Sequence, residues 1–101
     1  MSKKNVGEYW HNRFGNQEEV YDYSGRLMKK SAIGNQNSSY EPTIDHIRPL
    51  SQQGKDVEEN IVICNRKTNQ EKSNKFSTWR ANGKTFQAVR IRGNRSGYEI
   101  E

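Results

Sequence analysis

The sequence predicts one small α+β domain, in which a short N-terminal helix precedes several β-hairpins and a second, polar helix. Three observations predict this class. The 101 residues fit a single domain, only 30% of them are hydrophobic, and short apolar runs are separated by polar stretches rich in turn-forming residues. We therefore expect one domain over residues 1–101, with a thin core and long polar loops.

A helix is expected at the start of the chain. Asn5, followed three positions later by Glu8, is a variant of the capping box, and Gly15 is a stop signal. The aromatic residues between them include Trp10, which we expect in the core. His11 is expected on the exposed side of this helix.

A hairpin is expected next. Ser24 and Gly25 form a two-residue turn signal between residues 19–23 and 26–30. Residues 33–42 are rich in Gly, Asn and Ser and predict a loop.

The middle of the chain predicts two strands followed by a helix. Residues 43–47 form a strand-like run that ends before Pro49, and residues 61–64 are the most apolar run in the chain. Residues 50–60 between them are polar and predict a long loop. Residues 65–74 lack Gly and Pro and can form a helix, but they carry no apolar stripe. Something other than an apolar face must hold such a helix.

The last part of the chain predicts another hairpin. Asn82 and Gly83 provide the positive φ angles of a type I′ turn between residues 76–81 and 84–92. Residues 98–100 predict a final strand. Trp79 and Phe86 are expected in the core.

Composition also excludes several kinds of protein. No window approaches the roughly 18 apolar residues of a membrane span, and no apolar stretch follows Lys3 and Lys4. We expect no membrane partner, no secretory signal and a cytoplasmic location. Cys64 is the only cysteine, which excludes an intrachain disulfide and a structural zinc site of cysteine pairs. We expect Cys64 to fill a small buried space.

Positive charge is concentrated in the second half of the chain. The net charge is +5, but the segment from Asn65 to Arg95 carries nine basic residues and only one acid, Glu71. Such a segment attracts polyanions, although it can also be a solvated surface. We expect contact with a nucleic-acid backbone from Arg66, Lys67, Lys75, Arg80, Lys84, Arg90 and Arg92.

Five polar residues lie in the two central strands and the polar helix, at positions that suggest a functional site. Asp45 and His46 lie in the first central strand, Asn60 opens the second, and Asn69 and Lys72 share one face of the polar helix. Because neighbouring strand residues point to opposite faces, a strand end, bulge or strong twist is expected at Asp45 and His46.

These residue types suit the hydrolysis of a phosphodiester. A neutral imidazole, here His46, can remove a proton from water. Asp45 and Asn69 offer a carboxylate and an amide oxygen to a hard divalent cation. Lys72 can meet a phosphate as a point charge, and Asn60 can pin the long loop through its backbone.

Residues 43–49 and 60–62, together with Asn69 and Lys72, resemble the HNH endonucleases and their ββα-metal fold of a two-stranded antiparallel hairpin and a helix. The resemblance covers about residues 43–75 and is to the small stand-alone proteins of bacteria and phages. The spacing of nine between Asn60 and Asn69 is similar to that of the HNH domain of RNA-guided CRISPR nucleases and of some homing endonucleases.

The resemblance implies roles for these residues. His46 matches the general base, oriented by the main-chain carbonyl of Ile44. Asp45 and Asn69 match the metal ligands, and Asn60 matches the residue that organises the loop. Asn69 stands where many members carry His, which favours Mg²⁺ or Mn²⁺ over Zn²⁺ or Ni²⁺. The expected products carry 5′-phosphate and 3′-hydroxyl ends.

The expected partner is DNA, most simply double-stranded. One site cuts one strand, so double-strand cleavage needs a homodimer, a larger nuclease assembly or repeated nicking. Two alternatives stay open: a non-catalytic nucleic-acid-binding module with the same fold, and a nuclease subunit of a defence or phage assembly that a partner activates. An RNA substrate is a third.

Overall fold

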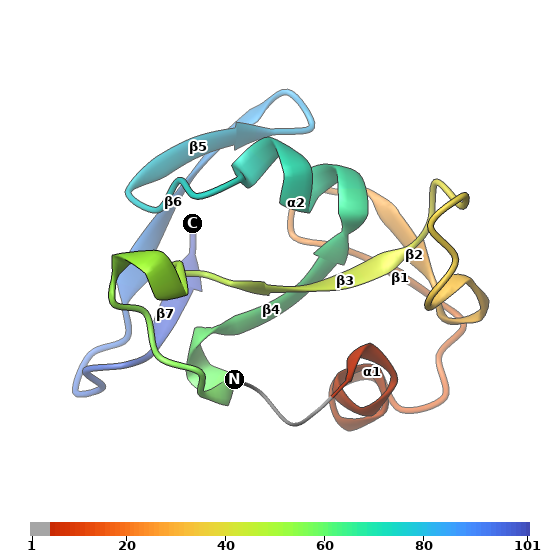
Figure 1. Cartoon of the computed structure of the whole chain (residues 1–101), viewed down its shortest axis with the longest axis horizontal. Coiled ribbons are helices and arrows are strands. Elements are labelled where there is room, and N and C mark those ends of the chain that lie inside the picture. The colour runs from red at the N-terminus through yellow and green to blue at the C-terminus, as the bar shows by residue number, and fades with distance from the viewer. Residues whose placement is uncertain (1–4) are drawn as a thin grey trace.

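A central two-stranded hairpin separates the two helices of the molecule (Figure 1). In the computed structural model, β3 (Pro42–His46) pairs antiparallel with β4 (Ile61–Asn65). Helix α1 (Val6–Phe14) lies against one face of this pair and α2 (Arg66–Lys72) against the other. The structure describes residues 5–101, so Lys3 and Lys4 lie outside it.

Two further antiparallel sheets flank the central hairpin. Figure 1 places the first pair at one end of the molecule and the three-stranded sheet at the other. The first contains β1 (Glu19–Tyr21) and β2 (Leu27–Lys29), and the second contains β5 (Thr78–Ala81), β6 (Lys84–Arg90) and β7 (Tyr98–Ile100). Three short 3₁₀ turns complete the fold at Lys30–Ala32, Leu50–Gln52 and Glu58–Asn60. No helix within residues 5–101 has the length and hydropathy to cross a bilayer.

The structure confirms the α+β class and the signals at several element ends. The Asn5 side chain accepts a hydrogen bond of 2.9 Å from the Glu8 N–H and caps α1, which ends at Gly15. Asn82 and Gly83 have φ angles of 51° and 73°, as a type I′ turn requires. These features were predictable because each depends on residues close together in the chain.

The turn of the first hairpin is larger than predicted. Ser24 and Gly25 do not form a two-residue turn, because the strands end at Tyr21 and begin again at Leu27. The buried Asp22 carboxylate holds the wider turn by accepting hydrogen bonds from the Ser24 N–H, the Ser24 hydroxyl and the Arg26 N–H. The other Asp22 oxygen accepts from the Asn65 N–H, so this turn is joined to the end of β4.

The apolar core lies on the α1 side of the central hairpin. Tyr9 and Trp10 of α1 pack with Ile61 and Ile63 of β4 and with Met28 of β2. The buried indole N–H of Trp10 donates to the Gln17 carbonyl, so the ring is buried without an unpaired donor. A second cluster, in which Tyr23 contacts Trp79 and Phe86 edge-on, lies towards the three-stranded sheet.

Polar bonds hold α2, as its lack of an apolar stripe required. Thr68 is fully buried, and its hydroxyl bonds with Ser24 and accepts from Arg26. Arg26 also pairs with Glu71, whose carboxylate accepts from the Asn82 N–H. The helix is shorter than the predicted 65–74, because Ser73 has a φ of 52° and ends it. Cys64 is fully buried, as predicted, and His11 is exposed.

Asn65 joins α2 to two other segments, and its removal is predicted to destabilise the fold. Its side chain accepts from the Lys67 N–H and donates to the carbonyls of Leu27 and Ser39. Asn65→Ala should lower the free energy of unfolding by about 2–4 kcal/mol, since it removes a cap and leaves two carbonyls unpaired. Urea unfolding followed by tryptophan fluorescence measures this loss.

Asn12→Ala, on the exposed side of α1, is the control and should change the free energy of unfolding by less than about 0.5 kcal/mol. A loss below about 1 kcal/mol in Asn65→Ala would contradict the linking role.

Candidate active site

Asp45 and His46 lie at the end of the central hairpin. His46 is the last residue of β3 and is paired with Ile61, while Asp45 is paired with Val62. Alternation along β3 places Asp45 and Thr43 on the face towards α2 and Ile44 towards the α1 core. The predicted interruption of the strand is therefore a strand end, at which the chain leaves the sheet immediately after His46.

The Asp45 carboxylate is largely buried against α2. Its side chain is 13% exposed, and Oδ2 lies 3.3 Å from the Lys72 ammonium. Burial raises the pKa of Asp45, and the neighbouring Lys72 charge offsets part of this increase. Oδ2 is buried and faces the Lys72 ammonium, so within the described chain this ion pair balances the charge of the carboxylate.

The structure does not place Lys72 where it could contact a phosphate. Its side chain is fully buried, and its ammonium donates to the His46 carbonyl at 3.2 Å. The same ammonium lies 5.2 Å from the centre of the Trp79 ring. A phosphate needs an exposed cation, so the expectation of direct contact is corrected: Lys72 is a counter-charge beneath Asp45.

Asn69 is fixed to β3 through its amide nitrogen. Nδ2 donates to the Thr43 hydroxyl at 3.1 Å and to the Ile44 carbonyl at 3.4 Å. The Thr43 hydroxyl in turn donates to the Cys64 carbonyl, which links the helix to both strands. These bonds leave the Asn69 Oδ1 available as a hard oxygen ligand on the same face as Asp45.

His46 is held by a residue that the sequence did not indicate. Its Nε2 lies 2.8 Å from Oδ1 of Asp56, in the loop between β3 and β4. The expected partner, the Ile44 carbonyl, instead accepts from Asn69. The hydrogen bond from His46 lowers the pKa of Asp56. Asp56 was missed because it stands among other polar loop residues and only the folded loop brings it to His46.

Asn60 is fully buried and makes the loop contacts that its position predicted. Its Oδ1 accepts from the Arg48 N–H at 2.8 Å. Its Nδ2 donates to the carbonyls of Arg48 and Lys55, at 3.0 and 2.8 Å. One amide thus joins the two ends of the polar loop, and it does not face solvent.

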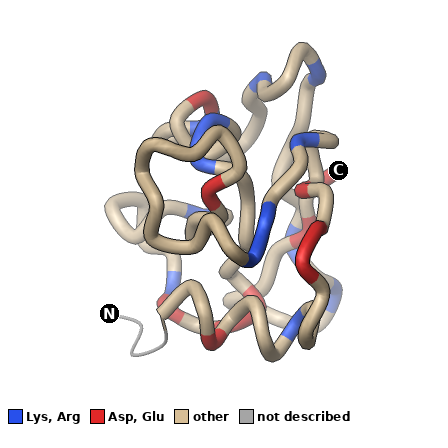
Figure 2. The backbone as a smooth tube through the Cα atoms, turned by 90° about the vertical axis from the view of Figure 1, so that its right-hand side faces the viewer, with Lys and Arg blue, Asp and Glu red and all other residues tan. Residues whose placement is uncertain are grey.

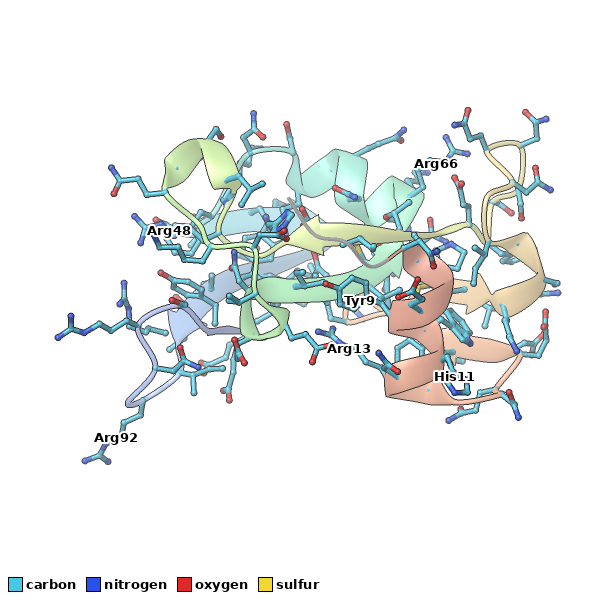
Figure 3. The ribbon with its side chains drawn as sticks, turned by 60° about the horizontal axis from the view of Figure 1, so that its bottom comes forward. Tyr9, His11, Arg13, Arg48, Arg66 and Arg92 are labelled. Carbon is cyan, nitrogen blue, oxygen red and sulfur yellow. The ribbon has the colours of Figure 1, made fainter. Side chains whose placement is uncertain are left out.

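The basic residues divide into two groups, and Figure 2 shows that lysines and arginines are spread over several segments of the backbone. The first group is engaged within the protein: Arg66 pairs with Glu41, Arg80 bonds Thr85 and Gly83, Lys84 bonds the Ser24 carbonyl, and Arg90 bonds Arg95 and Tyr98. The second group, Lys67, Lys75 and Arg92, is exposed, and its side chains make no hydrogen bond or ion pair within residues 5–101. Figure 3 shows Arg92 pointing away from the protein at its edge, far from Arg66.

The donor set suits a hard cation. Within the part of the chain that the structure describes, no three His, Cys, Asp or Glu side chains form a group able to hold a metal. Asp45 and Asn69 offer a carboxylate and an amide oxygen on the side of β3 that faces α2. Mg²⁺ keeps several waters and often uses only one or two protein carboxylates together with substrate phosphates, so these two residues fit such an ion.

A comparison with known protein families gives a match over the middle of the chain. A family model described as HNH endonuclease matches residues 22–78, which is more than half of the chain. The match contains the first hairpin turn, both central strands and α2, and therefore Asp45, His46, Asp56, Asn60, Asn69 and Lys72. No curated protein and no solved structure matches the chain.

Removal of the Lys72 charge is predicted to destabilise the protein in a pH-dependent way. Lys72→Met leaves the largely buried Asp45 carboxylate without its cation and should cost about 3 kcal/mol at pH 7. Asp45 already has a raised pKa, and loss of Lys72 raises it further. The penalty should therefore shrink as the pH falls and Asp45 takes up a proton. Urea unfolding of wild type and variant at pH 7 and pH 5 measures the change.

Two further variants test whether the loss of stability comes from the pair of Asp45 and Lys72. Lys75→Met removes an exposed lysine and should leave stability within about 0.5 kcal/mol of wild type. The double variant, Asp45→Asn with Lys72→Met, should lose less free energy of unfolding than the sum of the two single losses. In the double variant neither side chain is charged, so no buried charge is left without a partner. Additive losses, or a Lys72→Met penalty that grows at pH 5, would refute the buried pair.

Proposed function

Because the chain belongs to the HNH endonuclease family, we propose that it is a metal-dependent nuclease that hydrolyses phosphodiester bonds of double-stranded DNA. One observation carries this proposal: His46 follows Asp45 at the end of β3, and Asn69 of α2 is bonded to the same strand. In this proposal a base for water and two oxygen ligands for a cation act together at the end of the central hairpin. The strands β3 and β4 with α2 form the ββα-metal core of this proposal, within one domain over residues 1–101.

Asp45 and Asn69 would hold the metal ion, which we propose to be Mg²⁺ or Mn²⁺. When bound, the ion supplies positive charge against the phosphate and the leaving 3′ oxygen. The carboxylate of Asp45 and the Oδ1 of Asn69 would be the donors. The charge of Lys72 favours the ionised form of Asp45, which is the form that binds a cation.

His46 would act as the general base. With Nε2 bonded to Asp56, the other ring nitrogen, Nδ1, can accept a proton from water. The oxygen of that water forms a bond to phosphorus as the bond between phosphorus and the 3′ oxygen breaks. The leaving oxygen takes up a proton from solvent water, and His46 later releases its proton to solvent, so the products carry a 5′-phosphate and a 3′-hydroxyl.

Three exposed cations are the best-placed contacts for the DNA backbone. The side chains of Lys67, Lys75 and Arg92 have no partner in the described protein, so binding a phosphate breaks no existing bond. Arg66, Arg80, Lys84 and Arg90 support the fold through their own contacts and add charge to the surface. Phosphate contacts carry no sequence information, so this chain alone should cut DNA with little sequence preference.

Loss of the His46 imidazole is predicted to abolish DNA cleavage. With supercoiled plasmid and Mg²⁺, His46→Ala should nick about 10²–10⁴ times more slowly than wild type, the usual contribution of a general base. Asp45→Ala and Asn69→Ala should lose activity as well. His11→Ala removes the exposed histidine of α1 and should cut at the wild-type rate.

The same assay separates the alternatives. Equal background cutting by wild type and His46→Ala would exclude a nuclease that acts alone and favour a binding module or a partner-activated subunit. Far better cutting with Zn²⁺ or Ni²⁺ than with Mg²⁺ would contradict the two-oxygen site. Single-stranded DNA and RNA, tested beside the plasmid, decide the substrate.

The exposed cations are predicted to set the salt dependence of DNA binding. In a His46→Ala background, which prevents cleavage, alanine at Lys67, Lys75 and Arg92 should weaken binding. The slope of log K against log salt should decrease by about 0.9 for each DNA phosphate that the variant no longer neutralises. Fluorescence anisotropy with a short duplex at several salt concentrations measures it. Lys30→Ala, an exposed lysine beside the first hairpin, should leave the slope unchanged. An unchanged slope in the triple variant would place the DNA elsewhere.

A further inference from the structure

The long loop between β3 and β4 brings a carboxylate to the ring of His46. We propose that Asp56 is a positioning residue, which fixes the orientation and tautomer of His46 and leaves Nδ1 free to accept a proton. The inference rests on the proposed role of His46 as general base and adds to it the residue that prepares that base. Asp56 itself touches neither the substrate nor a metal in this account.

The contact between the two side chains carries the proposal. Nε2 of His46 and Oδ1 of Asp56 are 2.8 Å apart, and the two side chains are only 21% and 17% exposed. An ionised carboxylate can only accept a hydrogen bond. Nε2 must then carry the hydrogen of the neutral ring, which assigns the lone pair to Nδ1. The bond also lowers the pKa of Asp56, so the carboxylate stays ionised near neutral pH.

The backbone of the loop determines where Asp56 lies. Asn60 donates to the carbonyl of Lys55, the residue directly before Asp56. Gly54 packs so closely that a Cβ added to it would lie 1.8 Å from the Arg48 carbonyl oxygen. Any other residue at position 54 would have to push the two sides of the loop apart. The buried amide of Asn60 and the bare backbone of Gly54 together hold Asp56 opposite the end of β3.

The pair has a clear chemical use. When the ring takes a proton from water it becomes an imidazolium, and a carboxylate at 2.8 Å stabilises that charge. The same bond prevents the ring from turning away from the site. Serine proteases use a carboxylate in this manner, and its replacement by an amide there costs about 10⁴ in rate through the wrong tautomer.

Asp56→Asn tests the assignment with two independent readouts. The first is ¹⁵N NMR of the histidine ring without metal, at a pH where the ring is neutral. Wild type should show a protonated Nε2 and a bare Nδ1, and Asp56→Asn should lose this preference. The second is single-turnover plasmid cutting, in which the rate constant should fall at least about 10²-fold while DNA affinity stays within about twofold. Asp56→Glu should recover part of both.

Glu59→Gln is the matched control for Asp56→Asn. Glu59→Gln alters an exposed acid in the same loop and should leave the tautomer and the rate as in wild type. A wild-type ring protonated at Nδ1, or Asp56→Asn with wild-type tautomer and rate, overturns the proposal. If the tautomer depends on Asp56 but the wild type cuts no nucleic acid with any metal, the proposed function fails while the positioning of His46 stands. A variant that fails to fold is recognised by its NMR spectrum, and Asp56→Glu then carries the comparison.

Discussion

The three hydrogen bonds of the buried Asn60 side chain are the interaction on which the site depends. They join Arg48, just after β3, to Lys55, just before Asp56. The backbone hydrogen bond from the Ile47 N–H to the Asn60 carbonyl joins the same two ends of the loop. The side-chain bonds of Asn60 pair further backbone groups at a buried position, where an unpaired group is costly. With the close packing of Gly54, this amide determines the path of the loop that brings Asp56 to His46. Asn60 therefore contacts only the protein backbone, and it affects the proposed site through the position of the loop.

The second constraint is the buried positive charge of Lys72 beside Asp45. Burial alone would favour a neutral Asp45, which would bind a cation poorly. Lys72 opposes this from a fully buried position and also donates to the backbone of His46, so it links the two site residues. The helix that carries Lys72 and Asn69 packs through polar contacts rather than an apolar stripe. The larger apolar cluster thus lies on the α1 side of the hairpin, and Asp45, Asn69 and Lys72 lie on the α2 side.

Sequence alone predicted the parts of this protein that depend on neighbours in the chain. The Asn5 cap, the Asn82–Gly83 turn and the order of the central strands and α2 were of this kind. Contacts between distant residues were not: the turn at Asp22 is wide because it also binds Asn65, and Lys72 is buried because Trp79 covers it. Asp56 was missed for the same reason, since a loop carboxylate shows its partner only after folding.

Binding of Mn²⁺ followed by ¹H–¹⁵N NMR tests the central claim most directly, because a paramagnetic ion broadens the signals of the residues around it whether or not the protein cuts DNA. The backbone signals of Asp45, His46 and Asn69 should broaden first, and Asp45→Asn should remove the effect. Broadening centred on acids elsewhere, such as Glu99, or none at millimolar Mn²⁺, would contradict a metal site between β3 and α2.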